Sequence, residues 1–541
     1  MFPVRNLAKY GVITDVDSYD LPTEAWSMGV NVRFRSSKVS RGPVWRAVKR
    51  LGTANPRYAF GATPSSGLDF LFVGYKDGTV ARYTGGTEVD YTLTGWTTNS
   101  VEATYTNCVL GNIVYFNRSD RTPWYLRVTD TKFQNLTAGA GTYAWPSNWS
   151  AKILRASNSI LCAFNITIGG VNYPQMVKTS SVAQINSVPT SWDKSDPQSN
   201  ATENSLADME GGIVEAQPLG NAMYIYSLNE CWQMSYVAGQ DIWDYNKAFT
   251  KGAINTNCVI EINKRHIVFG PTDIWMHDGV TQKSICDQRT REFIYAGLNA
   301  SKANRCFIEH NELLHELMFC YVSGDSYAQF TGGPDACNRA AVWDYENDIW
   351  TFDDLPLVYF GHRANLDTTL TYATATQSYA TVGGSYQDQE DTFKRNAVFV
   401  GDDYSGAGLQ RTLYAFDPVG PLSQVSSPVD TNATKGSRLE RDGIDMDVVG
   451  ADLRGYKVCN SIYPQGRLDP QAAPVQFTVG AADYFNQNIT WDDTMTWDGL
   501  TNYKLDFNTA GRFIALHIYF PDYRLWTFSG YDADLDVLAE R

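Results

Sequence analysis

Hydrophobic and polar residues alternate strictly near the N-terminus. In "GVNVRFRSSKVSRGP", from Gly29, Val30, Val32 and Phe34 fall on one face of an extended strand, and polar side chains fall on the other. The Ser-Ser pair predicts a turn, residues 38–41 a returning strand, and Gly-Pro its end. The pattern therefore predicts an N-terminal β arm that carries its charge on one face.

Beyond this arm, one pattern recurs: an apolar strand, a turn rich in Gly, Asn and Asp, and a second strand with aromatic residues. It occurs at 69–84, 111–126, 158–177, 220–237, 264–280, 338–352 and 396–416. Several of these segments lie about forty to fifty residues apart, which is typical of four-stranded propeller blades. No WD or kelch signature repeats, and a long polar insert follows the third segment. A stacked array of β-sandwiches remains the alternative, and the number of blades stays open.

The remaining elements complete an all-β prediction. One helix is expected over 287–302, with Asp287 as its N-cap and Phe293, Ile294 and Leu298 on one face. A linker or long loop is expected near Pro418, followed by five strand candidates that suit a β-sandwich. We therefore expect an N-terminal arm over 1–58, a β-propeller over 59–420 and a C-terminal β-sandwich-like domain over 421–541.

The amino-acid composition supports this all-β architecture and indicates the compartment in which the protein is made. Charged residues make up only 19% of the chain and aromatic residues 13%, and Gly, Thr, Ser, Asn and Tyr are frequent. The nine cysteines form no C-x-x-C pair, so we expect reduced, mostly buried thiols made in a cytosol. No secretory signal and no apolar window of membrane-spanning length is found.

Charge is distributed unevenly. The formal net charge is −15, yet residues 25–68 hold eight Lys/Arg and no Asp or Glu, whereas residues 401–541 hold 20 Asp/Glu against 11 Lys/Arg. Such asymmetry indicates an arm that meets a partner of opposite sign, and a solvated hairpin protecting a sheet edge is the alternative. The basic arm and the acidic C-terminal part are candidates to meet, within one chain or between copies. Overall acidity argues against a protein that grips nucleic acid through its phosphates.

Motifs that would indicate catalysis are not found. The sequence has no phosphate-binding loop, dinucleotide fingerprint or nucleophile elbow, and His310 and His315 lack the i, i+4 spacing of two zinc ligands. Three carboxylate doublets could serve glycoside hydrolysis, but adjacent strand residues point to opposite faces and such doublets are more often turn residues. The doublets are Asp353-Asp354, Asp402-Asp403 and Asp492-Asp493. We expect no enzyme, no cofactor and no metal site.

Several segments resemble the tail nozzle proteins of short-tailed bacteriophages, also called tail tubular protein B or packaged-DNA stabilization proteins. The resemblance is carried by "KGAINTNCVIEINKRHIVFGPTDIWMHDGVTQKSICDQRTREFIYAGLN" from Lys251, by the preceding segment from Ile213, by "AWSMGVNVRFRSSKVSRGP" from Ala25, and by the closing strands from Gly511. These patterns of aromatic and turn residues cover about a third of the chain. The long polar insert and the unevenly spaced later segments depart from a regular blade pattern.

The resemblance implies a propeller with an added β domain, assembled as a six-copy ring that ends the DNA-ejection channel of a virion tail. It implies a head-to-tail adaptor and tail fibres or tailspikes as partners, with DNA passing the lumen without sequence-specific binding. Acidic walls would repel DNA phosphates. Assembly would take place in the bacterial cytoplasm. The basic arm would then face an adjacent subunit or the adaptor through Asn31, Arg33, Arg35, Lys38 and Arg41. The alternative is a glycan-binding or glycan-hydrolysing propeller with its site at "TWDDTMTWDG".

Overall fold

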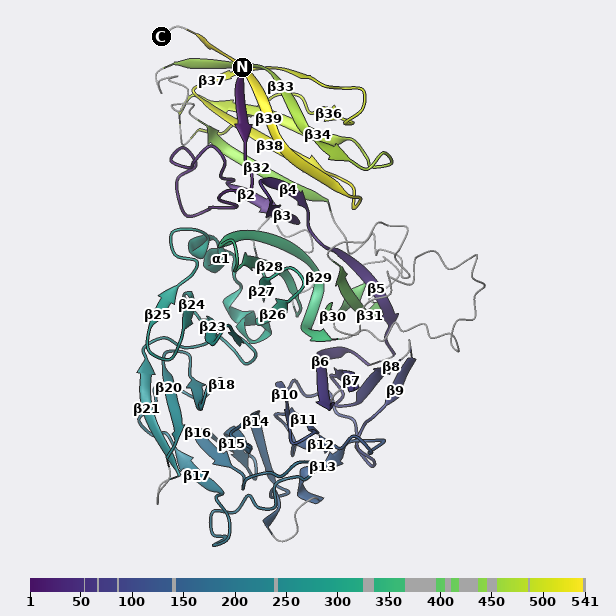
Figure 1. Cartoon of the computed structure of the whole chain (residues 1–541), viewed down its shortest axis with the longest axis vertical. Helices are drawn as coiled ribbons and strands as arrows, with labels where there is room; N and C mark the ends of the chain where they lie inside the picture. Colours follow the sequence, from purple (N-terminus) through teal and green to yellow (C-terminus); the bar gives the residue numbers. More distant parts are fainter. Residues whose placement is uncertain are drawn as a thin grey trace, which may run out of the picture.

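The computed structural model is built almost entirely of β-strands, as expected. It describes residues 1–52, 54–65, 68–84, 87–138, 143–237, 242–324, 335–364, 396–403, 410–417, 436–444, 455–484 and 487–538. A ring of radially arranged sheets forms one part, and two further sheets form a second part at one side of the ring (Figure 1). The first and the last strand of the described chain both lie in the second part.

Five separate four-stranded antiparallel sheets form consecutive blades of the ring. In each blade the strands lie side by side in sequence order, although a long connection separates β16 from β17. Blades 1 and 2 consist of β6 (Pro56–Ser65), β7 (Leu68–Tyr75), β8 (Val80–Thr84), β9 (Thr87–Asp90), β10 (Tyr105–Leu110), β11 (Ile113–Arg118), β12 (Trp124–Leu126) and β13 (Gln134–Asn135). Blade 3 consists of β14 (Trp149–Ser157), β15 (Ile160–Ile168), β16 (Val171–Thr179) and β17 (Thr202–Ser205). Blades 4 and 5 consist of β18 (Glu215–Leu219), β19 (Ala222–Tyr226), β20 (Cys231–Tyr236), β21 (Trp243–Phe249), β22 (Val259–Ile262), β23 (Arg265–Phe269), β24 (Ile274–His277) and β25 (Gln282–Ser284).

Blades 6 and 7 share one long strand, β29 (Ile349–Ala364). Its first half pairs with β28 and completes blade 6, and its second half pairs with β30 and begins blade 7. The change of blade occurs at Pro356, which has no N–H to donate, and at Leu357, whose φ of +50° lies in the left-handed region. The other strands of these blades are β26 (Phe307–Asn311), β27 (Glu316–Tyr321), β28 (Cys337–Asp344), β30 (Asn396–Asp403), β31 (Gln410–Asp417) and β5 (Val44–Arg50).

The ring closes through a strand from the N-terminal region. β5 pairs antiparallel with β31 and is the outermost strand of blade 7, so residues from near both ends of the chain complete one sheet. The first strands of the blades surround the centre, and each contacts the next, from β6 through β10, β14, β18, β22 and β26 to the second half of β29, which contacts β6. The described residues thus form a seven-bladed β-propeller.

Each of the seven repeated sequence segments falls in a different blade. Tight turns explain the Gly and Asn residues that mark them: Gly111 and Asn112 join β10 to β11 with φ of +57° and +65°, and Asn158 and Ser159 join β14 to β15 with φ of +51° and +63°. Two positive φ angles in a two-residue loop match the right-handed twist of a hairpin. The repeated sequence pattern therefore corresponds to hairpins of the blades.

The second part is a two-sheet β-sandwich built from both ends of the chain. One sheet has the order β3-β4-β39-β33-β37, with β1 also on β39, and the other has β2-β32-β38-β34-β35, with β36 also on β34. Phe477 and Phe528 pack between the sheets, with ring centroids 6.0 Å apart. The strands are β1 (Phe2–Arg5), β2 (Met28–Val30), β3 (Val32–Arg35), β4 (Lys38–Arg41), β32 (Ser437–Ile444), β33 (Tyr456–Leu468), β34 (Val475–Ala482), β35 (Thr490–Trp491), β36 (Met495–Trp497), β37 (Leu505–Gly511), β38 (Phe513–Phe520) and β39 (Trp526–Leu538).

The N-terminal residues do not form a separate arm of their own. β1 to β4 belong to the sandwich, and β5 belongs to blade 7. β2 pairs in parallel with β29 and antiparallel with β32, so one continuous sheet runs from blade 6 into the sandwich. The predicted hairpin is confirmed, because β3 pairs antiparallel with β4 across Ser36 and Ser37. The other partners of β2 and β4 lie hundreds of residues away and left no local signal. Most of the linker expected near Pro418 lies outside the described residues.

The expected helix is shorter than predicted. α1 spans Arg291–Gly297, and a 3-10 segment, η3 (Ala300–Arg305), follows it; a second 3-10 turn, η1, spans Leu136–Ala138. Asp287 does not cap α1, because Thr290 holds the N-cap position. The first backbone N–H groups of α1 donate to Asp15 instead, from Glu292 at 3.0 Å and from Phe293 at 3.4 Å. Asp15, from the N-terminal region, thus caps the helix in place of Asp287.

Candidate functional site

Arg33, which was expected to face another subunit, is buried at the junction of sandwich and propeller. The residue is 4% exposed. Its Nε donates to Glu316 at 2.7 Å, and its Nη1 and Nη2 donate to the two oxygens of Asp353 at 2.8 and 2.6 Å. Glu316 lies on β27 and Asp353 on β29, so one arginine of the sandwich binds two carboxylates of blade 6.

The other predicted interface residues also bind their own chain, with one exception. Arg35 donates to Glu316 at 2.8 Å, and Arg41, which is 8% exposed, donates to the backbone oxygen of Tyr523. Asn31 Nδ2 donates to the backbone oxygen of Gly436 at 3.1 Å, and Lys38 is exposed. The expectation of contact with a neighbouring subunit is therefore wrong for Arg33 and Arg41, because their guanidinium groups are enclosed by their own chain. The acidic partner that the charge asymmetry indicated is blade 6.

Burial and charge act in opposite directions at this junction. Burial alone would lower the pKa of Arg33, but the carboxylates of Asp353 and Glu316 outweigh it and raise that pKa. Burial raises the pKa of Glu316, against the effect of Arg33 and Arg35. A buried charge network of this kind tolerates loss of one member poorly, because a partner is then left uncompensated.

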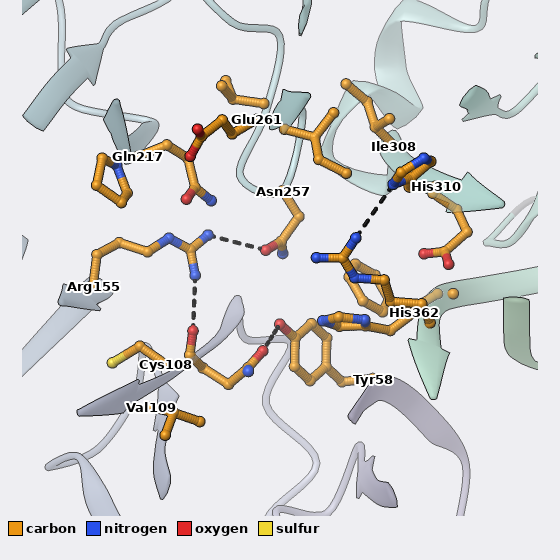
Figure 2. Close-up of a pocket in the computed structure, with 18 of the residues that line it drawn as sticks. Tyr58, Cys108, Val109, Arg155, Gln217, Asn257, Glu261, Ile308, His310 and His362 are labelled. Atoms are coloured by element: carbon orange, nitrogen blue, oxygen red, sulfur yellow. Dashed lines mark hydrogen bonds between the residues drawn. The ribbon is translucent and has the colours of Figure 1, made fainter. Parts of the chain in front are cut away.

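The innermost strands of the seven blades enclose a central cavity of about 390 Å³. Its volume falls in the range of small-molecule pockets. Figure 2 shows Arg155 facing this space opposite His310 and His362, with Asn257 between them. The polar lining residues are Tyr58, Asn107, Arg155, Gln217, Asn257, Glu261, Glu309, His310, His362 and Arg363.

One side of the cavity is organised around Arg155 on β14. Arg155 is 6% exposed and binds the carboxylate of Glu215, with Nη2 at 3.0 and 2.9 Å from its two oxygens. Arg155 Nη2 also donates to Asn257 at 3.2 Å. Glu215 accepts from the backbone N–H of Asn257 and from that of Ala216 at 2.7 Å. The positive charge of Arg155 is therefore compensated within the chain.

The opposite side holds Glu309 and His310 on β26 and Arg363 on β29. Arg363 Nη1 donates to Glu312 and lies 3.3 Å from Nδ1 of His310. Burial lowers the pKa of His310 to about 4, so its imidazole is neutral at neutral pH. Glu309 is 4% exposed, and burial raises its pKa well above the ordinary value. Its Oε1 accepts no hydrogen bond from any described residue.

Three carboxylates of the doublets considered for glycoside hydrolysis have partners within the described chain. Asp353 binds Arg33, and Asp354 lies 3.4 Å from Arg339. Asp492 accepts from the backbone N–H of Asn508 at 2.7 Å and from Thr509 at 2.9 Å, and these bonds lower its pKa. Asp402 and Asp403 end β30, and their side chains lie outside the described residues. Asp353, Asp354 and Asp492 thus hold strands and turns in place.

His310 and His315 share one polar neighbour. Both face the hydroxyl of Tyr345, at 3.2 and 3.3 Å. Within the described ranges, no group of three or more His, Cys, Asp or Glu side chains is placed to hold a metal ion. All nine cysteines are free and eight are buried, as expected. The search for a long apolar helix that could cross a membrane, made over the same described ranges, found none.

The central cavity was not predicted, although the propeller was. Its lining comes from seven strands, and most of them contribute only one to three residues. These residues are spread from Tyr58 to Arg363 and form no local motif. Their only common feature in the sequence is that they lie in or next to the innermost strand of a blade. This feature becomes visible only once the blades are known.

Comparison with known proteins adds likenesses of shape. No family model matches the chain, and no curated protein matches it. Among solved structures, the WD40 β-propeller domain of Doa1 is 9% identical with a TM-score of 0.35, covering 69% of this chain and 97% of that one. The WD40 repeats of RRP9 are 8% identical with a TM-score of 0.39, covering 70% and 100%.

A third likeness is to the extracellular domain of a protein described as a hybrid two-component system of B. thetaiotaomicron. It is 8% identical with a TM-score of 0.42 and covers 94% of this chain and 61% of that one. These values are too low to bear on function. The chain is a seven-bladed β-propeller joined to a β-sandwich, as its strand pairing establishes.

Proposed function

We propose that this chain is a structural subunit of the tail nozzle of a short-tailed bacteriophage, a six-copy ring through which DNA leaves the virion. In this role the chain has no catalytic function. It binds further copies of itself, a head-to-tail adaptor, and tail fibres or tailspikes. The sequence resemblance is the origin of the proposal, and its segments correspond to blade 4, blade 5 with α1, the start of the sandwich and its closing strands.

The observation that carries the proposal is the rigid connection between propeller and sandwich. One sheet continues from β29 through β2 into β32, and the buried Arg33 binds Glu316 and Asp353 across the same junction. Two bodies joined by both a sheet and a buried ion-pair network cannot hinge freely. A subunit that transmits load between an adaptor and a fibre needs this property, whereas a substrate-closing enzyme needs a hinge.

The size of the central cavity favours a conduit formed between copies. A cavity of about 390 Å³ admits a small molecule. It does not admit a DNA duplex, whose major groove alone is about 12 Å wide. DNA would therefore pass through an opening enclosed by several chains. The net charge of −15 suits such an opening, because acidic walls repel phosphates and let DNA slide.

Single-particle electron microscopy of the purified chain, alone and mixed with its adaptor, tests the proposal. We expect six-fold rings whose opening is wider than a duplex. Lys38→Glu reverses the exposed charge of the basic hairpin and is expected to weaken ring formation, whereas Lys283→Glu, exposed on β25 of blade 5, serves as the matched control. Particles that stay monomeric with the adaptor present would overturn the proposal. Rings that form equally well with Lys38→Glu would remove only the role of the hairpin.

A further inference from the structure

The central cavity of the propeller holds an acidic group that the fold does not use. We propose that this cavity binds a small organic cation of the alkylammonium class, with the Glu309 carboxylate as its counter-ion. The inference concerns the inside of a single propeller and does not depend on the nozzle proposal.

Glu309 differs from the other buried carboxylates of the described chain. It lines the cavity from the innermost strand β26, yet no described residue donates a hydrogen bond to it or forms an ion pair with it. Every other carboxylate buried to this degree in the described ranges has such a partner: Glu215, Glu230, Asp273, Glu316, Asp344, Asp353 and Asp354. A buried polar group is normally satisfied, so a ligand that completes Glu309 is the simplest explanation of its position.

The two arginines of the lining indicate the charge of the missing ligand. Arg155 is neutralised by Glu215 and Arg363 by Glu312, so neither guanidinium is left for an anion. The second acidic residue of the lining, Glu261 on β22, is exposed and has no ion-pair partner among the described residues. The uncompensated charge of the wall is therefore negative, and it favours a cation.

The rest of the lining suits an alkyl chain. Ile260 and Ile308 contribute apolar surface, and the rings of Tyr58 and Phe360 lie with their centroids 4.3 Å apart. Aromatic faces attract cations through their quadrupole, and apolar surface packs against methylene groups. A metal ion is a poorer candidate, because no three suitable ligands converge in the described residues.

Binding of a cation is linked to a proton. Burial raises the pKa of Glu309 well above its ordinary value, so the empty cavity favours the neutral carboxyl group. An ammonium group favours the ionised form, and the proton leaves to solvent as the cation enters. Arg363 opposes the raised pKa and Glu312 adds to it. The other titratable residues around the cavity are Tyr58, Cys108, Arg155, Glu261, His310 and His362.

Isothermal titration calorimetry with three ligands of one shape tests the inference. Butylammonium is expected to bind, with proton release detected as a dependence of the heat on the ionisation enthalpy of the buffer. Butanol and butyrate, its neutral and anionic analogues, are expected to bind at least about tenfold more weakly. Glu309→Gln keeps the shape, removes the charge, and should weaken butylammonium binding by about tenfold or more and abolish proton release.

Glu292→Gln, an exposed change on α1, is the matched control, and far-UV circular dichroism checks that each variant is folded. Absence of butylammonium binding to the unmodified chain would overturn the inference. So would equal binding to the folded Glu309→Gln variant. Tighter binding of butyrate would overturn it as well, since it would indicate an anion site on the arginines.

Discussion

The hydroxyl of Tyr226 lies 2.7 Å from Nδ1 of His266, deep between blades 4 and 5. It also lies 2.6 Å from Nε2 of His277. His266 Nε2 lies 2.9 Å from the backbone oxygen of Pro218 and must donate to it, so its Nδ1 accepts the Tyr226 proton. The backbone N–H of Gly279 donates to His277 Nδ1, so Nε2 of His277 carries a proton and donates to Tyr226. In this hydrogen-bonded group, every donor and acceptor has a partner only if both histidines are neutral.

Removing the Tyr226 hydroxyl should destabilise the propeller. In Tyr226→Phe, His266 Nδ1 and His277 Nε2 both lose their partner inside the protein. We expect a loss of about 1–3 kcal/mol in the free energy of unfolding. Urea unfolding at pH 7 measures it, with Tyr173→Phe as a control, because Tyr173 is 46% exposed and its hydroxyl has no such role. Equal midpoints for the two variants would contradict a stabilising role of the Tyr226 hydroxyl.

The same network predicts sensitivity to acid. Burial lowers the pKa of His266 to about 4 and that of His277 to about 3, below the ordinary value of 6.5. Between pH 6.5 and about pH 4 the unfolded chain binds more protons than the folded chain. The free energy of unfolding is therefore highest above pH 6.5 and falls as the pH drops toward 4. Each histidine contributes a slope of up to about 1.4 kcal/mol per pH unit.

Urea titrations at several pH values between 7 and 4 measure that slope. His277→Gln should reduce it, whereas His315→Gln, whose imidazole is 51% exposed, should leave it unchanged. A slope that is the same in all three proteins would contradict the prediction.

Breaking the ion-pair network at the junction should cost more than breaking any surface pair. Arg33→Met leaves Asp353 without its partner and Glu316 with Arg35 alone. We expect about 3–5 kcal/mol of destabilisation in thermal or urea unfolding. Adding Asp353→Asn and Glu316→Gln should recover part of the loss, since the uncompensated charges are then gone. Lys38→Met, on the same hairpin but exposed, should change stability by less than about 0.5 kcal/mol.

Closure of the ring should depend on Trp45. This residue of β5 is 3% exposed and packs against Phe399 and Phe416, with ring centroids 5.2 and 4.5 Å away. Trp45→Ala should destabilise the chain by about 3–5 kcal/mol. Amide hydrogen exchange should show the loss of protection concentrated in β30 and β31, because blade 7 loses its outer strand first. Val89→Ala, on the outer strand of blade 1 and 46% exposed, is the control and should leave protection in blade 7 unchanged.

Neutralising Glu309 should stabilise the unliganded protein. Its folded-state pKa is raised, so the folded chain holds a proton that the unfolded chain releases, and stability falls as the pH rises above 4.5. Glu309→Gln removes this loss. We expect a higher urea midpoint than that of the unmodified chain at pH 8 and little difference at pH 4. Each pKa unit of the shift corresponds to about 1.4 kcal/mol. A variant less stable at pH 8 would contradict the prediction.

Local sequence patterns predicted the blades but not how the ends of the chain join them. Hairpins such as 111–126 could be recognised because turn residues and alternating strands are neighbours in sequence. The blade count stayed open because a long insert follows the third segment and the later segments are unevenly spaced. Nor does the sequence indicate that blade 7 takes its outer strand from residues 44–50, more than 350 residues before β31. Periodicity does not report pairing at such a distance.

The basic hairpin illustrates the same limit for the candidate site. Its charge correctly indicated an acidic partner, but charge alone does not distinguish a neighbouring subunit from blade 6 of the same chain. Alternation placed Arg33 on the polar face of its strand, and the structure buries that face under Glu316 and Asp353. The sequence predicted that this face meets an adjacent subunit or the adaptor, whereas in the structure blade 6 of the same chain covers Arg33.

The shared use of both chain ends has a consequence for biosynthesis. Most strands before residue 51 are synthesised long before their partners: β1 and β4 pair with β39, β2 with β29 and β32, and β5 with β31. At about 5–20 residues per second, the first strands wait on the order of tens of seconds for partners. During that time the blades can form in order, but the ring stays open and Trp45 stays uncovered. Until these partners are made, the incomplete chain exposes apolar surface to which chaperones can bind.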